Sequence, residues 1–368
     1  MSKRFRRGLV VGKFAPLHRG HELLIGRALD ECDEVIVISY QSPEFPGYPA
    51  EVRERWLAAR FPQTTRLVLT EERLRAITGP GGPRRIPPND GDPVEDRRFC
   101  GYLCQQVLGV TVDAVFTSEE YGDPFAAELT RYFRQTQPDA PEVRHVLVDR
   151  ARERLPVSGT LLRADPHRHR RYLSAEVYAS FVRRVCLLGG ESTGKSTLAM
   201  TLARELGTEW VPEYGREIWM EKGGVLDFED MEHIGRTQIR DEEEAAGRAE
   251  RWIICDTSPL TTLFYSHQIF GRAAPALEQM AERAYDLTVL CVPDFAFVQD
   301  GTRHGGDFRH QQHAWYLREL ESRGIPFLHA TGSLDERVAQ VGAAMESIDA
   351  IRGASPLPGV QAPGRAGS

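Results

Sequence analysis

Two histidines follow the first apolar run of the chain at a spacing that suits a phosphate site. Residues 12–21 read GKFAPLHRGH and come directly after the apolar residues 8–11. Because His18 and His21 are three residues apart at an expected helix start, both imidazoles can face one ligand. A helix N-terminus binds polyphosphate through its amide groups, and the imidazoles can stabilise charge that develops on a pyrophosphate leaving group. The other residues expected at this polyphosphate site are Gly12, Lys13 and Phe14.

The full run 12–21 resembles the GxFxPxHxGH signature of the nucleotidyltransferase superfamily, and residues 157–163, which read VSGTLLR, resemble its second signature ISxTxxR with valine in place of isoleucine. The resemblance implies transfer of a nucleoside monophosphate from ATP to a substrate phosphate. It also implies that Ser158 and Thr160 open a helix and that Arg163 holds the ATP phosphates with paired N–H groups. Lys13 either holds a phosphate or caps the loop.

A third motif, GGESTGKS at residues 189–196, matches the pattern GxxxxGK[ST] in full. It lies between an apolar run expected to be a strand and a run typical of a helix, which is the context of a P-loop. In such a loop the amides surround the phosphates, Lys195 neutralises phosphate oxygens and the Ser196 hydroxyl binds Mg²⁺. The residues expected to bind ATP here are Gly189, Glu191, Ser192, Thr193, Gly194, Lys195, Ser196 and Thr197.

Two acidic residues follow expected strands in the same half of the chain. Glu213 comes after residues 210–211, and Asp256 comes after the apolar run 252–255. Because parallel strands share their carboxyl edge with the P-loop, we expect one acid to act as base toward the acceptor hydroxyl and the other to lie near Mg²⁺. The cleaner apolar run before Asp256 favours Asp256 as the base. The ordinary alternatives are a charged helix start for Glu213 and a helix N-cap for Asp256.

Further residues of this half are expected to contact the acceptor or the transferred phosphate. Tyr214 and Arg216 follow Glu213 directly. The basic, glycine-containing segment 300–309 is expected to close over the site as a lid, with an ordinary surface loop as the alternative. The lid residues expected at the site are Asp300, Arg303 and Arg309.

Both halves are similar to the bifunctional NadR-type proteins. The matching segments of the first half are residues 116–122 (FTSEEYG) and the stretch around Arg53, Arg55 and Trp56, although Trp56 can equally be a core residue. Those of the second half are the P-loop, residues 213–217, residues 255–257 and the start of the lid. The resemblance implies phosphorylation of nicotinamide riboside by ATP and adenylyl transfer to nicotinamide mononucleotide, giving NAD.

The family often carries a DNA-binding helix-turn-helix at its N-terminus. This chain starts at the first strand of the nucleotidyltransferase half, so a repressor role is not expected. Two other interpretations stay open. The same two chemistries could act on another nucleoside or a phosphopantetheine-like substrate, because the HxGH and P-loop motifs do not define the acceptor. The chain could also be a nucleotide-sensing regulator, although both catalytic motifs are complete.

The order of expected elements predicts an α/β protein with a parallel sheet in each of two domains. A Rossmann-like nucleotidyltransferase domain is expected over residues 1–178 and a P-loop NTPase kinase domain over residues 179–350. Residues 351–368 are rich in Gly, Pro and Ala and are expected to be disordered. Strands are expected at residues 8–12, 34–39, 66–70, 114–117, 185–188, 252–255, 287–292 and 326–329. Helices are expected at residues 20–32, 50–60, 94–108 and 197–206.

The composition is that of a folded protein. Of the 368 residues, 41% are hydrophobic and 27% are charged, as in globular domains. The net charge of -7 disfavours a broad nucleic-acid surface. The partners that the motifs and the resemblance imply are nicotinamide nucleotides and ATP, with Mg²⁺ as the metal. Six scattered cysteines predict reduced thiols in a cytoplasmic protein rather than a zinc site. No apolar stretch is long enough to span a membrane, and a homo-oligomer stays open.

Overall fold

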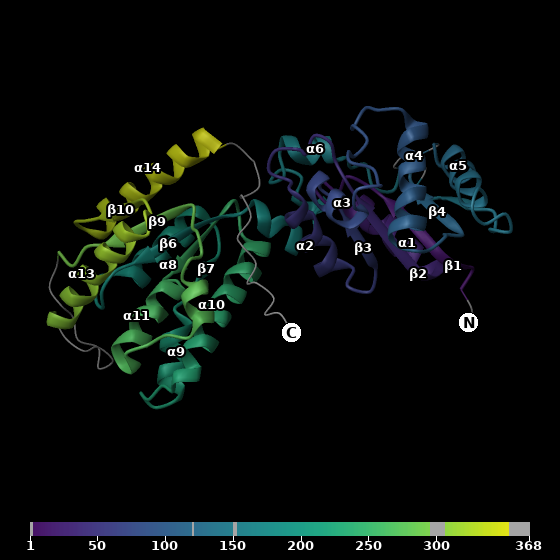
Figure 1. The fold of residues 1–368 in the computed structure, drawn as a ribbon. Helices are drawn as coiled ribbons and strands as arrows, with labels where there is room; N and C mark the ends of the chain where they lie inside the picture. Colours follow the sequence, from purple (N-terminus) through teal and green to yellow (C-terminus); the bar gives the residue numbers. More distant parts are fainter. Residues whose placement is uncertain (1–2, 120, 150–152, 295–305, 353–368) are drawn as a thin grey trace. The chain divides into compact units, whose positions relative to one another are not determined.

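The chain forms two compact units, residues 1–177 (unit 1) and residues 178–368 (unit 2). The structure is a computed structural model that describes residues 3–119, 121–149, 153–294 and 306–352. Each unit is built on a five-stranded sheet whose paired strands are all parallel, with helices packed around it (Figure 1). This confirms the α/β class and the two parallel sheets expected from the sequence. The tail expected to be disordered lies outside the described residues from position 353 onward.

Unit 1 has the strand order β3-β2-β1-β4-β5. Its strands are β1 (Phe5–Val11), β2 (Cys32–Ser39), β3 (Thr65–Val68), β4 (Ala114–Thr117) and β5 (Arg144–Leu147). Its helices are α1 (Arg19–Glu31), α2 (Ala50–Arg60), α3 (Glu71–Thr78), α4 (Pro93–Tyr102), α5 (Gly122–Arg134), α6 (Gly159–Ala164) and α7 (Ala175–Tyr178). The strand order reverses between β1 and β4, where open α/β sheets bind ligands at the carboxyl ends of the strands. The loop that carries His18 follows β1, so it lies at this point.

Unit 2 has the strand order β10-β9-β6-β8-β7. Its strands are β6 (Arg183–Leu188), β7 (Trp210–Val211), β8 (Trp252–Asp256), β9 (Leu287–Cys291) and β10 (Phe327–Ala330). Its helices are α8 (Lys195–Leu206), α9 (Tyr214–Glu221), α10 (Phe228–Arg248), α11 (Pro259–Phe270), α12 (Pro275–Met280), α13 (Gly306–Ser322) and α14 (Leu334–Arg352). The P-loop joins β6, the central strand, to α8.

The central strand of unit 2 shows why helices cover both faces of the sheet. All six residues of β6 are buried. Val185 and Leu187 pack in one core with residues of α8 and α14, whereas Cys186 and Leu188 pack in another with residues of α10, α11 and α13. Because successive strand residues point to opposite faces, two cores and two helix layers follow from the apolar run 185–188, as is usual for parallel strands.

Several elements differ from the expected ones. The strand β5 was not expected because its four residues include Arg144 and His145 and both of its end residues are exposed. Within the described residues it pairs with β4 alone, at the edge of the sheet. Helices α3 and α5 were not expected either. The helix expected over residues 94–108 ends at Tyr102 and continues as a π-helix over Leu103–Val107.

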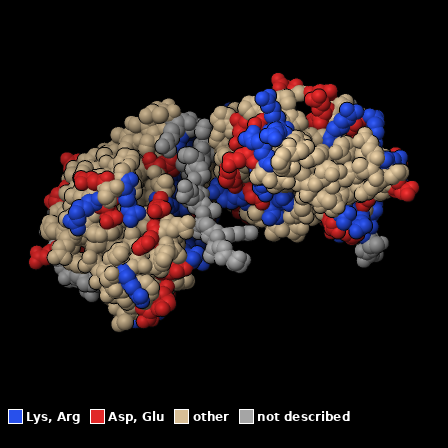
Figure 2. All heavy atoms as spheres, viewed as in Figure 1, with Lys and Arg blue, Asp and Glu red and all other residues tan. Residues whose placement is uncertain are grey.

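Charged side chains of both signs are interspersed on the face of the molecule that Figure 2 shows. All six cysteines are buried free thiols. Within the described residues, the helices are too short or too polar to span a membrane.

Unit 2 also buries an ion pair in its interior. Arg283 donates from Nε to Glu242 at 2.8 Å, and both side chains are at most 4% exposed. The Tyr285 hydroxyl donates to the other oxygen of Glu242 at 2.9 Å. Burial raises the pKa of Glu242, and Arg283 opposes this rise. The carboxylate therefore depends on its two donors to stay charged inside the fold.

We predict that Arg283→Met destabilises unit 2 by about 3–5 kcal/mol, because it leaves the Glu242 charge buried without its cation. Urea unfolding followed by circular dichroism measures the change. The control is Arg323→Met, which removes a partly exposed pair with Glu319 and is expected to cost less than about 1 kcal/mol. Equal destabilisation by the two substitutions would contradict the prediction.

Candidate functional site

In unit 1, the two histidines of the first motif lie together at the start of α1. His18 is the N-cap residue of this helix, and its Nδ1 accepts a hydrogen bond from the His21 amide at 3.4 Å. The two rings stack with their centroids 3.7 Å apart, and the edge of Phe14 contacts His21 at 4.8 Å between centroids. A Cβ on Gly20 would lie 3.1 Å from the His18 ring and 3.3 Å from Val157. Glycine therefore lets the second motif pack closely against the first.

Arg163 joins the two motifs. Its guanidinium donates to the Ala15 carbonyl oxygen at 2.6 Å, across 148 positions of the sequence, and to the Thr160 hydroxyl at 3.1 Å. Ser158 is the N-cap of α6 and accepts from the Leu161 amide at 3.2 Å. The hydrogen bonds hold Arg163 beside the loop that precedes His18.

A second cation lies near Arg163. The Lys13 ammonium is 5.7 Å from the centre of the Phe45 ring, and the Arg163 guanidinium is 4.2 Å from the same centre. Lys13 also donates to the Asn89 carbonyl at 3.3 Å. Burial lowers the pKa of Lys13, and the positive charge of Arg163 lowers it further. Two neighbouring cations that repel each other make a site that favours an anion.

The loop of the first motif is supported by residues whose role the sequence reasoning missed. The Lys13 carbonyl accepts hydrogen bonds from Gln41 at 3.0 Å and from the Ser39 hydroxyl at 3.3 Å. Ser39 in turn accepts from Arg53 at 2.6 Å, and Arg53 is fully buried and paired with Glu44 at 2.7 Å. An arginine on the apolar face of α2 was the one sequence signal for this support. Trp56 is a core residue at 1% exposure.

In unit 2, the P-loop has the close-packed geometry that its glycines allow. Gly189 has φ +146° and Gly194 has φ +78°, and both values favour glycine. The Lys195 ammonium donates to the carbonyl oxygens of Gly189 and Gly190 at 2.9 and 3.1 Å, and the Thr193 hydroxyl donates to that of Gly190 at 2.8 Å. The lysine is thus folded over its own loop, at the position where phosphate oxygens would compete for it.

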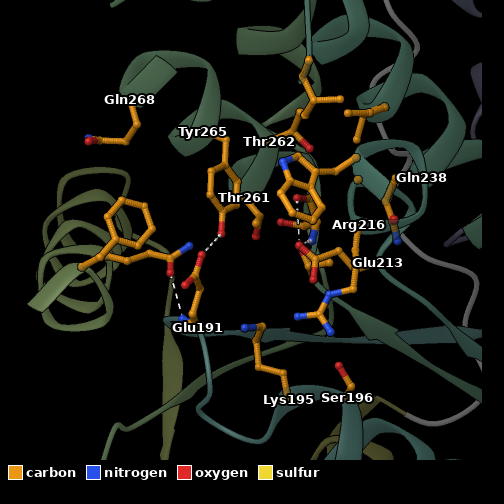
Figure 3. A pocket seen from close by; sticks show the side chains of 18 of the residues that line it. Glu191, Lys195, Ser196, Glu213, Arg216, Gln238, Thr261, Thr262, Tyr265 and Gln268 are labelled. Carbon is orange, nitrogen blue, oxygen red and sulfur yellow. Dashed lines mark hydrogen bonds between the residues drawn. The ribbon is translucent and has the colours of Figure 1, made fainter. Parts of the chain in front are cut away.

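A cavity of about 590 Å³ opens beside this loop. Figure 3 shows Lys195 and Ser196 on one side, Glu191 and Tyr265 on a second, and Glu213 with Arg216 on a third. Apolar residues complete the lining, and these include Trp219, Leu226, Met231, Ile234 and Ile269. The cavity therefore offers a charged end next to the P-loop and an apolar part suited to a ring.

The two candidate acids hold different positions. Glu213 lines the cavity, and its pKa is raised because burial outweighs the attraction of Lys195. Asp256 is the last residue of β8, is 2% exposed and is not among the lining residues. Burial also raises the pKa of Asp256, with Lys195 opposing.

Ser196 and Asp256 are the residues that could hold a magnesium ion. The two side chains share a hydrogen bond. The Asp256 Oδ1 atom is buried and has no hydrogen-bond partner within the described part of the chain. A hydroxyl and a carboxylate oxygen next to a P-loop are hard oxygen ligands of the kind Mg²⁺ takes. The donor set therefore fits the metal that the sequence predicts.

Other predicted site residues lie elsewhere. The Tyr214 ring packs against His233, and its hydroxyl lies 3.2 Å from the His233 ring nitrogen; Tyr214 is not among the residues that line the cavity. Arg309 was expected in a lid loop, but it lies in helix α13 and is 6% exposed. The adjoining Phe308 packs on Phe264 of α11, with the ring centroids 5.7 Å apart. Asp300 and Arg303 lie outside the described residues.

Two residues that were not predicted from the sequence support the P-loop. Gln312 of α13 accepts a hydrogen bond from the Glu191 amide at 2.9 Å. Arg337 of α14 is 3% exposed and donates to the Thr193 carbonyl at 3.0 Å. Arg337 also donates to the carbonyls of Val292 and Gly332, both at 2.9 Å. No motif marks these positions, because each lies far from the P-loop in sequence.

Comparison with known proteins agrees with this arrangement. A family described as "AAA domain" matches residues 184–337. The trifunctional NAD biosynthesis/regulator protein NadR of Escherichia coli K12 is 29% identical over 344 residues, which are 87% of this chain and 78% of that protein. NadR of Salmonella typhimurium LT2 is also 29% identical, over 88% of this chain and 78% of its own length. A crystal structure of NadR with NAD and AMP-PNP shares the fold, with a TM-score of 0.61, 20% identity and coverage of 98% and 100% of the two chains.

We predict that Gly190→Ala weakens binding of ATP at the P-loop about tenfold or more, because the added Cβ would lie 2.6 Å from the Arg309 carbonyl oxygen. Titration with a non-hydrolysable ATP analogue and Mg²⁺, followed by tryptophan fluorescence, measures it, since Trp219 lines the cavity. Gly342→Ala in α14 is the matched control, since its Cβ meets nothing within 4 Å. An unchanged affinity in the Gly190 variant would show that the loop tolerates the displacement.

Proposed function

Because this chain is a homologue of the NadR proteins over most of its length, we propose that it makes NAD from nicotinamide riboside in two steps. Unit 2 phosphorylates the riboside with ATP to give nicotinamide mononucleotide. Unit 1 transfers the adenylyl group of a second ATP to that product and releases pyrophosphate. The observation that carries the proposal is that each unit assembles its own motif residues at the carboxyl edge of its own parallel sheet.

In the kinase step we assign the base to Glu213. Glu213 lines the cavity, whereas Asp256 does not. Its pKa is also raised toward neutral pH, and a general base works best when its pKa lies near the pH of the reaction. Glu213 takes the proton of the primary hydroxyl while the hydroxyl oxygen attacks the γ-phosphorus and ADP leaves. This assignment replaces the preference for Asp256 that the strand pattern gave.

Lys195 and the P-loop amides neutralise charge on the β- and γ-phosphates. Ser196 and Asp256 would hold Mg²⁺, which supplies further charge neutralisation on the phosphate oxygens when it is bound. Arg216 lines the same cavity and opposes the rise in pKa of both Glu213 and Asp256. Its positive charge suits it to approach the transferred phosphoryl group.

In the adenylyl-transfer step the residues of unit 1 act by positioning and charge. The mononucleotide phosphate attacks the α-phosphorus of ATP, and the bond to pyrophosphate breaks. His18 and His21 stabilise the charge that develops on the leaving pyrophosphate. The proximity of Lys13 and Arg163 at one aromatic ring supports a role for both in holding the ATP phosphates. The reaction needs no base, because the attacking phosphate is already ionised at neutral pH.

We predict reciprocal losses when each unit is altered. His18→Ala and His21→Ala should lower adenylyl transfer by on the order of 10²-fold or more and let nicotinamide mononucleotide accumulate. Lys195→Ala should abolish phosphorylation of the riboside and still convert supplied mononucleotide to NAD. Mass spectrometry of reactions with riboside or mononucleotide, ATP and Mg²⁺ measures both.

The wild-type chain is the reference for these reactions. If it turns over neither nicotinamide substrate, the acceptor is wrong, and the same assay with other nucleosides or phosphopantetheine tests the alternative. Binding of nucleotides without turnover would favour a nucleotide-sensing regulator.

A further prediction separates the two acids of the kinase. Glu213→Gln should lower kcat for riboside phosphorylation by about 10²-fold or more at saturating Mg²⁺, because it removes the base. Asp256→Asn should instead raise the Mg²⁺ concentration needed for half-maximal activity, because it weakens a metal ligand. Steady-state rates over a Mg²⁺ series distinguish them. The roles are reversed if only the Asp256 variant keeps normal Mg²⁺ dependence while losing kcat.

A further inference from the structure

The phosphate-binding loop of unit 2 contains a residue with a carboxylate side chain. Glu191 is the third residue of the GGESTGKS motif, and its side chain lines the cavity. On the basis of the proposed kinase function, we propose that Glu191, oriented by Tyr265, binds the ribose hydroxyls of the acceptor and makes unit 2 select ribosides over deoxyribosides.

The position of Glu191 is fixed from two helices. The Tyr265 hydroxyl of α11 donates to Glu191 Oε1 at 3.2 Å, and the Glu191 amide donates to Gln312 of α13 at 2.9 Å. Figure 3 shows the carboxylate turned toward Tyr265, across the cavity from Glu213. The side chain is therefore held on the wall of the cavity rather than free to turn out to solvent.

The chemistry of the group decides which ligand it faces. A carboxylate accepts hydrogen bonds and donates none, so it repels the ATP phosphates that the rest of the loop attracts. Any contact of Glu191 with ATP, as the motif predicts, would therefore come from the loop backbone and not from the carboxylate. The groups it can bind are donors, and the vicinal hydroxyls of a ribose offer two of them side by side.

The rest of the lining leaves room for the sugar at this place. The primary hydroxyl has to reach Glu213 and the phosphate bound at Lys195, and a base would pack in the apolar part near Trp219 and Ile234. Glu191 is close enough to Glu213 for its charge to affect that residue. The sugar ring, which connects the hydroxyl to the base, then passes between the two carboxylates.

The experiment compares one riboside with its 2′-deoxy counterpart. The wild-type chain is first offered nicotinamide riboside and a panel of purine and pyrimidine ribosides with ATP and Mg²⁺. The riboside that is phosphorylated fastest is then measured beside its 2′-deoxy analogue. The variants are Glu191→Ala, Glu191→Gln, Tyr265→Phe and the control Glu205→Gln, which removes the same charge from an exposed position on α8.

We expect the wild-type kcat/KM to favour the riboside by on the order of 10- to 100-fold, as for loss of a charge-assisted hydrogen bond. In Glu191→Ala the value for the riboside should fall by that factor, mainly through KM, while that for the deoxy analogue stays within about threefold. Glu191→Gln and Tyr265→Phe should give intermediate ratios. Glu205→Gln should keep the wild-type ratio.

Measuring the riboside and its 2′-deoxy analogue side by side distinguishes loss of hydroxyl recognition from distortion of the P-loop. A distorted loop lowers the kcat/KM of both substrates by the same factor. Equal losses, or a wild-type ratio in Glu191→Ala, would overturn the inference. If the wild-type chain phosphorylates another riboside but not nicotinamide riboside, the proposed acceptor is wrong. The role of Glu191 is then decided by the kcat/KM ratio of that other riboside to its 2′-deoxy analogue. If no riboside is phosphorylated, both proposals fall.

Discussion

Both units depend on one constraint, which is that parallel strands end at the same edge of a sheet. A backbone of this kind brings together loops that are distant in sequence, and each following helix points its N-terminus at that edge. In unit 1 this places the His18 loop after β1 near the strand-order reversal. In unit 2 it gathers the P-loop after β6, Glu213 after β7 and Asp256 at the end of β8. The topology therefore sets the positions at which anions can bind and acids can act, and the side chains at those positions supply the chemistry.

The sequence predicted the parts of this scheme that are local. The strand-loop-helix context around Lys195 and the spacing of His18 and His21 are set by neighbouring residues, so a motif can identify them. The α/β class followed from the alternation of expected strands and helices along the chain, and apolar runs such as residues 185–188 are typical of parallel strands that are covered on both faces. The edge strand β5 has no such run, and its existence depends on pairing with β4 rather than on its own residues.

Long-range support could not be predicted in the same way. Gln312 and Arg337 reach the P-loop through contacts across 121 and 144 positions, which their own neighbours in sequence do not encode. The choice between Glu213 and Asp256 shows the same limit. A strand pattern indicates that both acids reach the edge of the sheet, but which one faces the cavity depends on how the ends of β7 and β8 are covered by other elements. The choice of acceptor depends on the same covering elements, because they form the walls of the cavity.

The guanidinium of Arg337 also bears on the order in which the P-loop gains its contacts while the chain is being synthesised. Its hydrogen bond to the Thr193 carbonyl spans 144 positions, and its other donors hold the carbonyls that follow β9 and β10. Until α14 has been synthesised, the Thr193 carbonyl lacks this donor. A nascent chain that stops short of α14 therefore carries the complete motif, and the Gln312 side chain that accepts from the Glu191 amide, without the hydrogen bond from Arg337.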